Sequence, residues 1–115
     1  MASVQPSQDP VSFEDRRIYP RVPVALPAFL QANGERHSVQ LLDVSAGGAK
    51  LDCSLSLATG TEVVLDCGIL GRAAVVRWHG PNVLGVNFES ELDAREISSL
   101  VNRSEALAAW RKDRE

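Results

Sequence analysis

An aspartate, a serine and two glycines stand close together in the segment QLLDVSAGGAK, at positions 40–50. Asp43 and Ser45 are two residues apart, so in a strand their side chains point to the same face. Gly47 and Gly48 allow a positive φ and let a ligand approach the main chain without meeting a Cβ. The segment therefore offers a carboxylate, a hydroxyl and open backbone amides. A guanine base suits it, because its N1–H and N2–H₂ can both donate to one carboxylate.

The same residues also suit a tight turn, which Asp43 and Ser45 would cap through their own backbone. A second cluster bears on this choice: Arg16, Arg17 and Arg21 fall in the run RRIYPR. The planar guanidinium donates pairs of hydrogen bonds to phosphate and to the O6/N7 edge of guanine. A solvated basic run before the first strand is the alternative. Taken together, the two clusters suit a guanine nucleotide that carries phosphates.

The bulk properties describe one soluble domain. The chain has 115 residues and a net charge of −3, so its surface as a whole is not suited to DNA, RNA or an anionic membrane. The first fifteen residues contain no Lys, Arg or apolar run and do not resemble a signal peptide. We expect a cytoplasmic, monomeric protein without membrane insertion, in which Cys53 and Cys67 are reduced and buried.

Short β-rich runs, separated by turn residues, follow a polar N-terminal segment. We expect a flexible tail over residues 1–15, a barrel over 16–90 and a C-terminal helix within 91–115. The predicted fold is all-β dominated, a six-stranded antiparallel β-barrel with one packed helix. The expected strands are 22–32, 37–44, 49–55, 61–67, 72–79 and 82–88.

The predicted helix runs from about Glu91 to Arg111, with a candidate break near Asn102. Ser90 and Asp93 have the spacing of a helix-capping pair. Apolar residues between Ile97 and Trp110 fall largely on one stripe, which we expect to cover one face or mouth of the barrel.

The chain resembles the PilZ domain family, receptors for the bacterial second messenger cyclic di-GMP, whose signature is RxxxR followed by [DN]xSxxG. RIYPR supplies Arg17 and Arg21, and DVSAGG supplies Asp43, Ser45 and Gly48. The resemblance covers about residues 16–88 and includes VVRW and VLGVNF.

The resemblance implies a role for each matching residue. Arg17 and Arg21 would grip phosphates and guanine edges, Asp43 would accept from guanine, and Ser45 would bond base or phosphate. Close approach of the ligand would be permitted at Gly48. In the family, an arginine directly before RxxxR accompanies two stacked ligands. Arg16 therefore implies two cyclic di-GMP molecules per chain.

Trp78 has two interpretations. Ala74, Val76 and Trp78 alternate along one strand and predict a core tryptophan. Some family members place an aromatic residue from this strand near the ligand, so Trp78 is also a candidate site residue.

Other chemistry is weakly indicated. His37, His79, Cys53 and Cys67 lack the close pairing of a zinc site, so no metal and no other cofactor are expected. We find no nucleophile–base pairing and no P-loop, and predict a non-enzyme.

The resemblance implies a cyclic di-GMP receptor that regulates a separate effector protein of motility, adhesion or biofilm formation. A ligand-independent PilZ-like adaptor is the alternative, and a small nucleic-acid-binding barrel is a third reading that the acidic balance disfavours. We expect residues 12–21 to be mobile without ligand and to close on the 43–48 turn when cyclic di-GMP binds.

Overall fold

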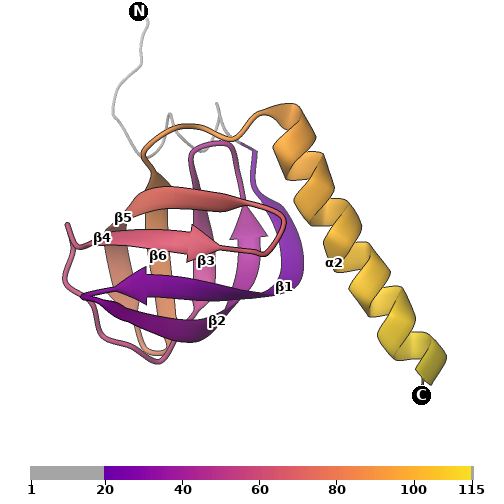
Figure 1. The fold of residues 1–115 in the computed structure, drawn as a ribbon, viewed down its shortest axis with the longest axis horizontal. Coiled ribbons are helices and arrows are strands. Elements are labelled where there is room, and N and C mark those ends of the chain that lie inside the picture. Colours follow the sequence, from indigo (N-terminus) through magenta and orange to yellow (C-terminus); the bar gives the residue numbers. More distant parts are fainter. Residues whose placement is uncertain (1–19, 115) are drawn as a thin grey trace, which may run out of the picture.

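The computed structural model of the chain describes residues 20–114. Six antiparallel strands close into a barrel in the order β1-β2-β3-β6-β5-β4, and one helix, α2 (Ala94–Arg114), follows them (Figure 1). The strands are β1 (Val22–Ala32), β2 (Glu35–Val44), β3 (Gly48–Asp52), β4 (Glu62–Asp66), β5 (Gly71–Gly80) and β6 (Val83–Phe88). The predicted barrel and C-terminal helix are confirmed. The predicted tail lies outside the described residues.

The first hairpin sets the register of the barrel. Asn33 and Gly34 form its two-residue turn with φ of 54° and 79°, and a positive φ at both positions is what a type I′ turn requires. β1 pairs with β2 on one side and with β4 on the other, and this second pairing closes the barrel. A closed barrel leaves no unpaired edge strand for another chain to join.

Alternation along the strands fills the interior with aliphatic side chains. One buried residue on each of four adjacent strands faces its partner on the next strand, in the order Val44 (β2), Ala49 (β3), Val86 (β6) and Val76 (β5). The bulkiest fully buried side chains are Leu26, Leu30, Leu41, Leu51, Leu84, Leu100, Val44 and Val76. Outward-facing positions of the same strands are thereby left free to build a site.

Both cysteines are part of this core. Cys53 and Cys67 are buried and free, as the sequence predicts. Burial, and to a lesser extent the neighbouring Asp66 carboxylate, raises the pKa of the Cys67 thiol from 9.0 to about 11. The thiolate is the reactive form, so Cys67 is an inert packing residue at neutral pH.

The helix starts later than predicted and is not broken. Asp93 Oδ1 accepts from the backbone N–H of Glu96 at 2.8 Å, and Glu96 Oε1 accepts from that of Asp93 at 3.0 Å. These reciprocal bonds are a capping box, so the predicted Ser90–Asp93 cap is wrong. The N–H of Leu92 still donates to the Ala46 carbonyl at 2.9 Å, which keeps the chain tied to the barrel up to the cap. α2 then continues through Asn102 to Arg114.

α2 lies beside β1 (Figure 1), and its apolar stripe packs against the core of the barrel. Leu100 is buried, and Ile97 and Leu107 lie against the core. The register of β1 shifts between Pro23 and Leu26, and the N–H of Ala25 donates to Ser104 Oγ on the helix at 2.9 Å. Within the described residues, no helix has both the length and the apolar composition to cross a membrane.

Candidate functional site

Four residues on adjacent strands form one row on the outer face of the barrel. Asp43 on β2 is paired with Lys50 on β3, Lys50 with Gly85 on β6, and Gly85 with Trp78 on β5. Neighbouring strands lie about 4.8 Å apart, so this outer row spans about 14 Å. Because Gly85 has no side chain, the row has a hollow between Lys50 and Trp78.

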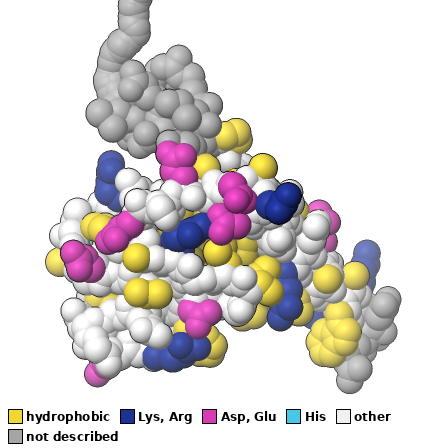
Figure 2. All heavy atoms as spheres, turned by 45° about the horizontal axis from the view of Figure 1, so that its top comes forward, with side chains coloured by type: hydrophobic (Ala, Val, Ile, Leu, Met, Phe, Trp, Pro, Cys, Tyr) yellow, Lys and Arg dark blue, Asp and Glu magenta, His cyan; other side chains and the backbone are white. Residues whose placement is uncertain are grey.

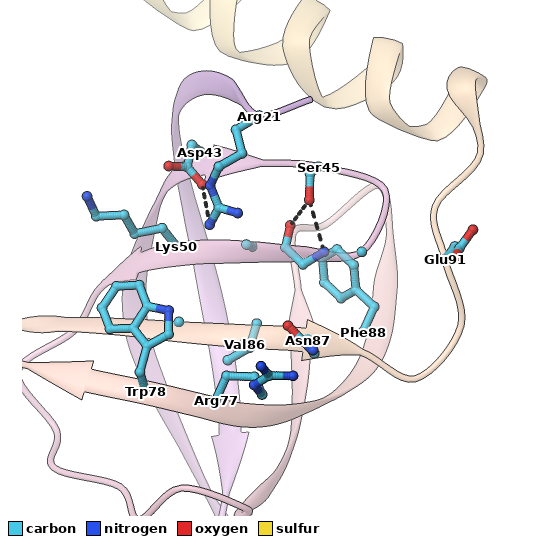
Figure 3. Close-up of a pocket in the computed structure, with 14 residues that line it drawn as sticks. Arg21, Asp43, Ser45, Lys50, Arg77, Trp78, Val86, Asn87, Phe88 and Glu91 are labelled. Atoms are coloured by element: carbon cyan, nitrogen blue, oxygen red, sulfur yellow. Dashed lines mark hydrogen bonds and ion pairs between the residues drawn. The ribbon is translucent and has the colours of Figure 1, made fainter. Parts of the chain in front are cut away.

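The outer row borders a cavity of about 480 Å³. Figure 3 shows Arg21 and Asp43 on one side of it and Trp78 and Arg77 on the other, with Lys50 between them. The residues that line the cavity are Arg21, Asp43, Ser45, Gly47, Gly48, Ala49, Lys50, Arg77, Trp78, Gly85, Val86, Asn87, Phe88 and Glu91. The structure therefore brings together six of the eight predicted site residues. The other two, Arg16 and Arg17, lie outside the described residues.

The prediction of a core tryptophan is wrong. Between Val76 and Trp78 the register of β5 against β6 shifts, because Arg77 is an extra residue. This β-bulge breaks the alternation that Ala74 and Val76 begin, so Trp78 turns outward and is 43% exposed. Both Arg77 and Trp78 consequently line the cavity.

Arg21 and Asp43 form an ion pair at the rim, with Arg21 Nη2 3.3 Å from Asp43 Oδ1 (Figure 3). The approach does not have the geometry of a hydrogen bond, and Oδ1 is buried without a hydrogen-bond donor among the described residues. A buried carboxylate oxygen in this state is unfavourable. Donors from a ligand would therefore stabilise Asp43.

The turn after β2 is closed by Ser45. Its N–H donates to the Gly48 carbonyl at 2.9 Å, and its buried hydroxyl oxygen accepts from the Gly48 N–H at 3.2 Å. The turn-capping interpretation is therefore confirmed for Ser45. Among the described residues Asp43 makes no hydrogen bond of this kind to the turn and instead forms an ion pair with Arg21. The two side chains thus have different partners, although both border the cavity.

The role predicted for the two glycines needs correction. The glycines with positive φ in the described chain are Gly34, Gly60 and Gly68, so neither Gly47 nor Gly48 uses that freedom. A Cβ added at Gly48 would lie 2.3 Å from the Val86 carbonyl oxygen on β6. Glycine is therefore required at position 48 mainly by the close approach of β3 and β6, and only secondarily by any approach of a ligand.

Sequence reasoning did not select the other eight residues of the cavity wall, which are Ala49, Lys50, Arg77, Gly85, Val86, Asn87, Phe88 and Glu91. Lys50 and Arg77 add positive charge on either side of Gly85. The spacing of Lys50, two residues beyond Gly48, places it on the outer face and was an available signal. Arg77 lines the cavity because it is the extra residue of a β-bulge, and no residue pattern predicts this bulge.

On the face that Figure 2 shows, basic and acidic side chains lie interspersed over the barrel and helix. An anion would therefore be attracted by local groups and not by a large positive field. The cavity has a local excess of positive charge, with Arg21, Lys50 and Arg77 against Asp43 and Glu91.

Comparison with solved structures supports the same architecture. The PilZ domain of CeSA from a cellulose-synthesizing bacterium has a TM-score of 0.54 and 17% identity, covering 76% of this chain and 97% of that one. Borreliella burgdorferi PlzA, solved in complex with c-di-GMP, has a TM-score of 0.59 and 15% identity, covering 77% of this chain and 41% of PlzA. The Bacillus subtilis inhibitor of motility MotI/DgrA has a TM-score of 0.54 and 20% identity, covering 82% of this chain and 52% of that one.

The chain thus corresponds to about half or less of the length of PlzA and MotI/DgrA. At these identities the likeness shows a shared fold. No curated protein sequence is similar enough to count as a match. The family model of the PilZ domain, however, matches residues 15–106, which include both arginine and Asp/Ser/Gly motifs and the whole barrel. The chain belongs to the PilZ domain family.

Proposed function

We propose that this protein is a receptor for cyclic di-GMP that binds the nucleotide in the cavity and regulates an effector protein. The observation that carries the proposal is the convergence of Arg21, Asp43 and Trp78 on one cavity from three separate parts of the chain. Membership of the PilZ family supports it, as does the complex of PlzA with c-di-GMP.

Each group has a task that suits its chemistry. The Asp43 carboxylate accepts from guanine N1–H and N2–H₂, which relieves its buried oxygen. The exposed Trp78 indole stacks on a base, and such stacking is sequence-tolerant and strong. Arg21, Lys50 and Arg77 neutralise phosphates.

Two variants test the placement of the ligand by isothermal titration. Loss of one charge-assisted contact removes about 1.5–3 kcal/mol, so Arg21→Ala should weaken cyclic di-GMP binding at least tenfold. Asp43→Asn keeps the shape of the side chain but replaces one acceptor oxygen by an NH₂ group, which cannot accept from guanine. This variant should weaken binding similarly.

Arg36→Ala is the matched control, because Arg36 pairs with Asp66 at 3.3 Å and stacks on Phe29, outside the cavity. It removes one positive charge and should leave affinity within about twofold. Near-wild-type binding by both site variants would refute the site. Wild-type protein that does not bind cyclic di-GMP would favour the ligand-independent adaptor.

We also propose that two stacked molecules bind per chain. Each cyclic di-GMP carries two phosphates, so a pair brings four negative charges. The described cavity supplies three cations, and Arg16 and Arg17 would add two more. Arg16→Leu should lower the stoichiometry from two to one, and a wild-type stoichiometry of one, measured well above the Kd, would refute the pair.

For signalling, we propose that the ligand joins residues 12–21 to the 43–48 turn, which creates a composite surface for the effector. By linkage, an effector that binds this surface must also tighten nucleotide binding. Amide NMR relaxation with and without cyclic di-GMP tests this step. Order parameters of residues 13–19 that do not rise with ligand would contradict it. Motility, adhesion and matrix production are the proposed outputs, and MotI/DgrA is a motility inhibitor of the same fold.

A further inference from the structure

At Gly85 the side chain of Trp78 occupies the space where a Cβ would be. The three atoms nearest to an added Cβ are Cε2, Nε1 and Cζ2 of Trp78, at 2.2, 2.3 and 2.7 Å. Gly85 faces outward in the outer row, yet it is buried, because the indole covers it. Its φ is not positive, so the backbone conformation does not require glycine.

The hollow at Gly85 sets the distance between the Trp78 indole and the backbone of β6. Lys50 on β3 borders the hollow from the other side, and Trp78 enters it from β5 across the bulge at Arg77. Part of the indole is in contact with Gly85 on β6, and Trp78 as a residue is still 43% exposed on a wall of the cavity. The contact with Gly85 therefore limits how close to the sheet the indole can lie.

We propose that Gly85 is a positioning residue, which sets the height and orientation of the Trp78 indole and thereby the platform on which a base of cyclic di-GMP stacks. The inference rests on the proposed function and deepens it, because it assigns part of the affinity to a residue that need not touch the ligand. A methyl group at Gly85 must move the ring by about 1 Å before ordinary contact distance is reached.

Such a methyl group should disturb the site and spare the fold. The atoms that it meets belong to the partly exposed side chain of Trp78, which has solvent on its other side to move into, whereas at Gly48 the corresponding atoms are backbone. Gly85→Ala should therefore remain folded with a displaced Trp78. Gly71→Ala is the matched control on β5, because the nearest atom to its added Cβ, the Leu65 carbonyl oxygen, is 3.9 Å away.

The first measurement needs no ligand. In a Trp110→Phe background, Trp78 gives the remaining indole N–H signal of the two tryptophans in the chain. Gly85→Ala should shift this signal and increase quenching of Trp78 fluorescence by acrylamide, while Gly71→Ala should change neither. An unchanged indole signal and unchanged quenching in Gly85→Ala would overturn the proposal.

The second measurement is a double-mutant cycle on cyclic di-GMP affinity. Removing the platform by Trp78→Ala should weaken binding about 5- to 150-fold, the range for one base–aromatic stack. Gly85→Ala should weaken it at least fivefold in the wild-type background and less than twofold when Trp78 is already alanine. Equal losses in the two backgrounds would mean that Gly85 acts on the fold and not through Trp78, and would overturn the proposal. If the wild-type protein does not bind cyclic di-GMP, the proposed function fails, and the indole measurement still decides whether Gly85 positions Trp78.

Discussion

Replacing Gly48 by alanine should destabilise the barrel, and this loss of stability should be its main effect, independent of ligand binding. β3 begins at Gly48, which is paired with Asn87 on β6, and an added Cβ would lie 2.3 Å from the Val86 carbonyl oxygen and 3.3 Å from its carbon. Ordinary contact begins near 3.4 Å, so the two strands must separate by about 1 Å at this point. Neither strand can yield by rotating a side chain, because the atoms that collide are backbone.

The magnitude follows from the cost of overpacking, about 1–3 kcal/mol in a well-packed region. A domain of this size loses about 4–8 °C in Tm for each kcal/mol, so Tm should fall by about 5–20 °C. The same separation would strain the hydrogen bond from the Phe88 N–H to the Gly47 carbonyl, now 2.8 Å. The loss is a large fraction of the stability of a typical domain.

Thermal unfolding followed by circular dichroism measures the effect, with Gly71→Ala as the control. At Gly71 an added methyl group has space, and Gly→Ala also reduces the entropy of the unfolded chain, so Tm should stay the same or rise slightly. If Gly48→Ala melts within about 2 °C of wild type and loses only ligand affinity, Gly48 serves ligand approach and the strand-contact explanation is wrong.

Two further predictions concern the helix cap and the buried thiol. Asp93→Ala should lower the free energy of unfolding by about 0.5–2 kcal/mol in urea titrations, because the hydrogen bond to the Glu96 N–H is lost. Asp93→Ser should retain most of the wild-type stability, because serine can also cap the helix. Equal stability of the two variants would contradict the capping box. For Cys67, the pKa is raised to about 11 by folding, so the unfolded thiol ionises first and the free energy of unfolding should fall as pH rises from about 9 to 11. Cys67→Ala should show a shallower fall over the same range, and identical pH slopes in urea titrations would contradict the assignment.

Much of the barrel can be predicted because its signals are local. Alternating aliphatic residues and the Asn33–Gly34 turn determine strands and the first hairpin from neighbouring residues alone. The start of α2 also has a local signal, the Asp93–Glu96 capping box, but the Ser90–Asp93 spacing offers a competing one. The bond from the Leu92 N–H to the Ala46 carbonyl, a contact distant in sequence, ties the chain to the barrel up to the cap. Two motifs of opposite chemistry, arginines and an acceptor turn, predict one anionic ligand site, and the structure brings Arg21 and Asp43 from these motifs to one cavity.

The details of that site depend on register and therefore escape sequence reasoning. Strict alternation favours a core position for Trp78 over its alternative as a site residue, and one extra residue in β5 places it on the cavity wall. Position 48 has no space for a Cβ because of the Val86 backbone on β6, which is almost forty residues away along the chain. Lys50 becomes a neighbour of Gly85 only when β3 and β6 pair. A β-bulge has no reliable residue signature, so cross-strand neighbours could not be listed in advance.

Selectivity between guanine and adenine tests the central claim most directly. Cyclic di-AMP has the same phosphates and ring stacking, but adenine N1 is an acceptor and would face the Asp43 carboxylate in place of a donor. We predict that isothermal titration of the whole chain gives saturable binding of cyclic di-GMP, at least tenfold tighter than that of cyclic di-AMP, and that Asp43→Asn removes most of this difference. Absence of saturable cyclic di-GMP binding, or equal affinity for the two nucleotides, would contradict a guanine site built on Asp43.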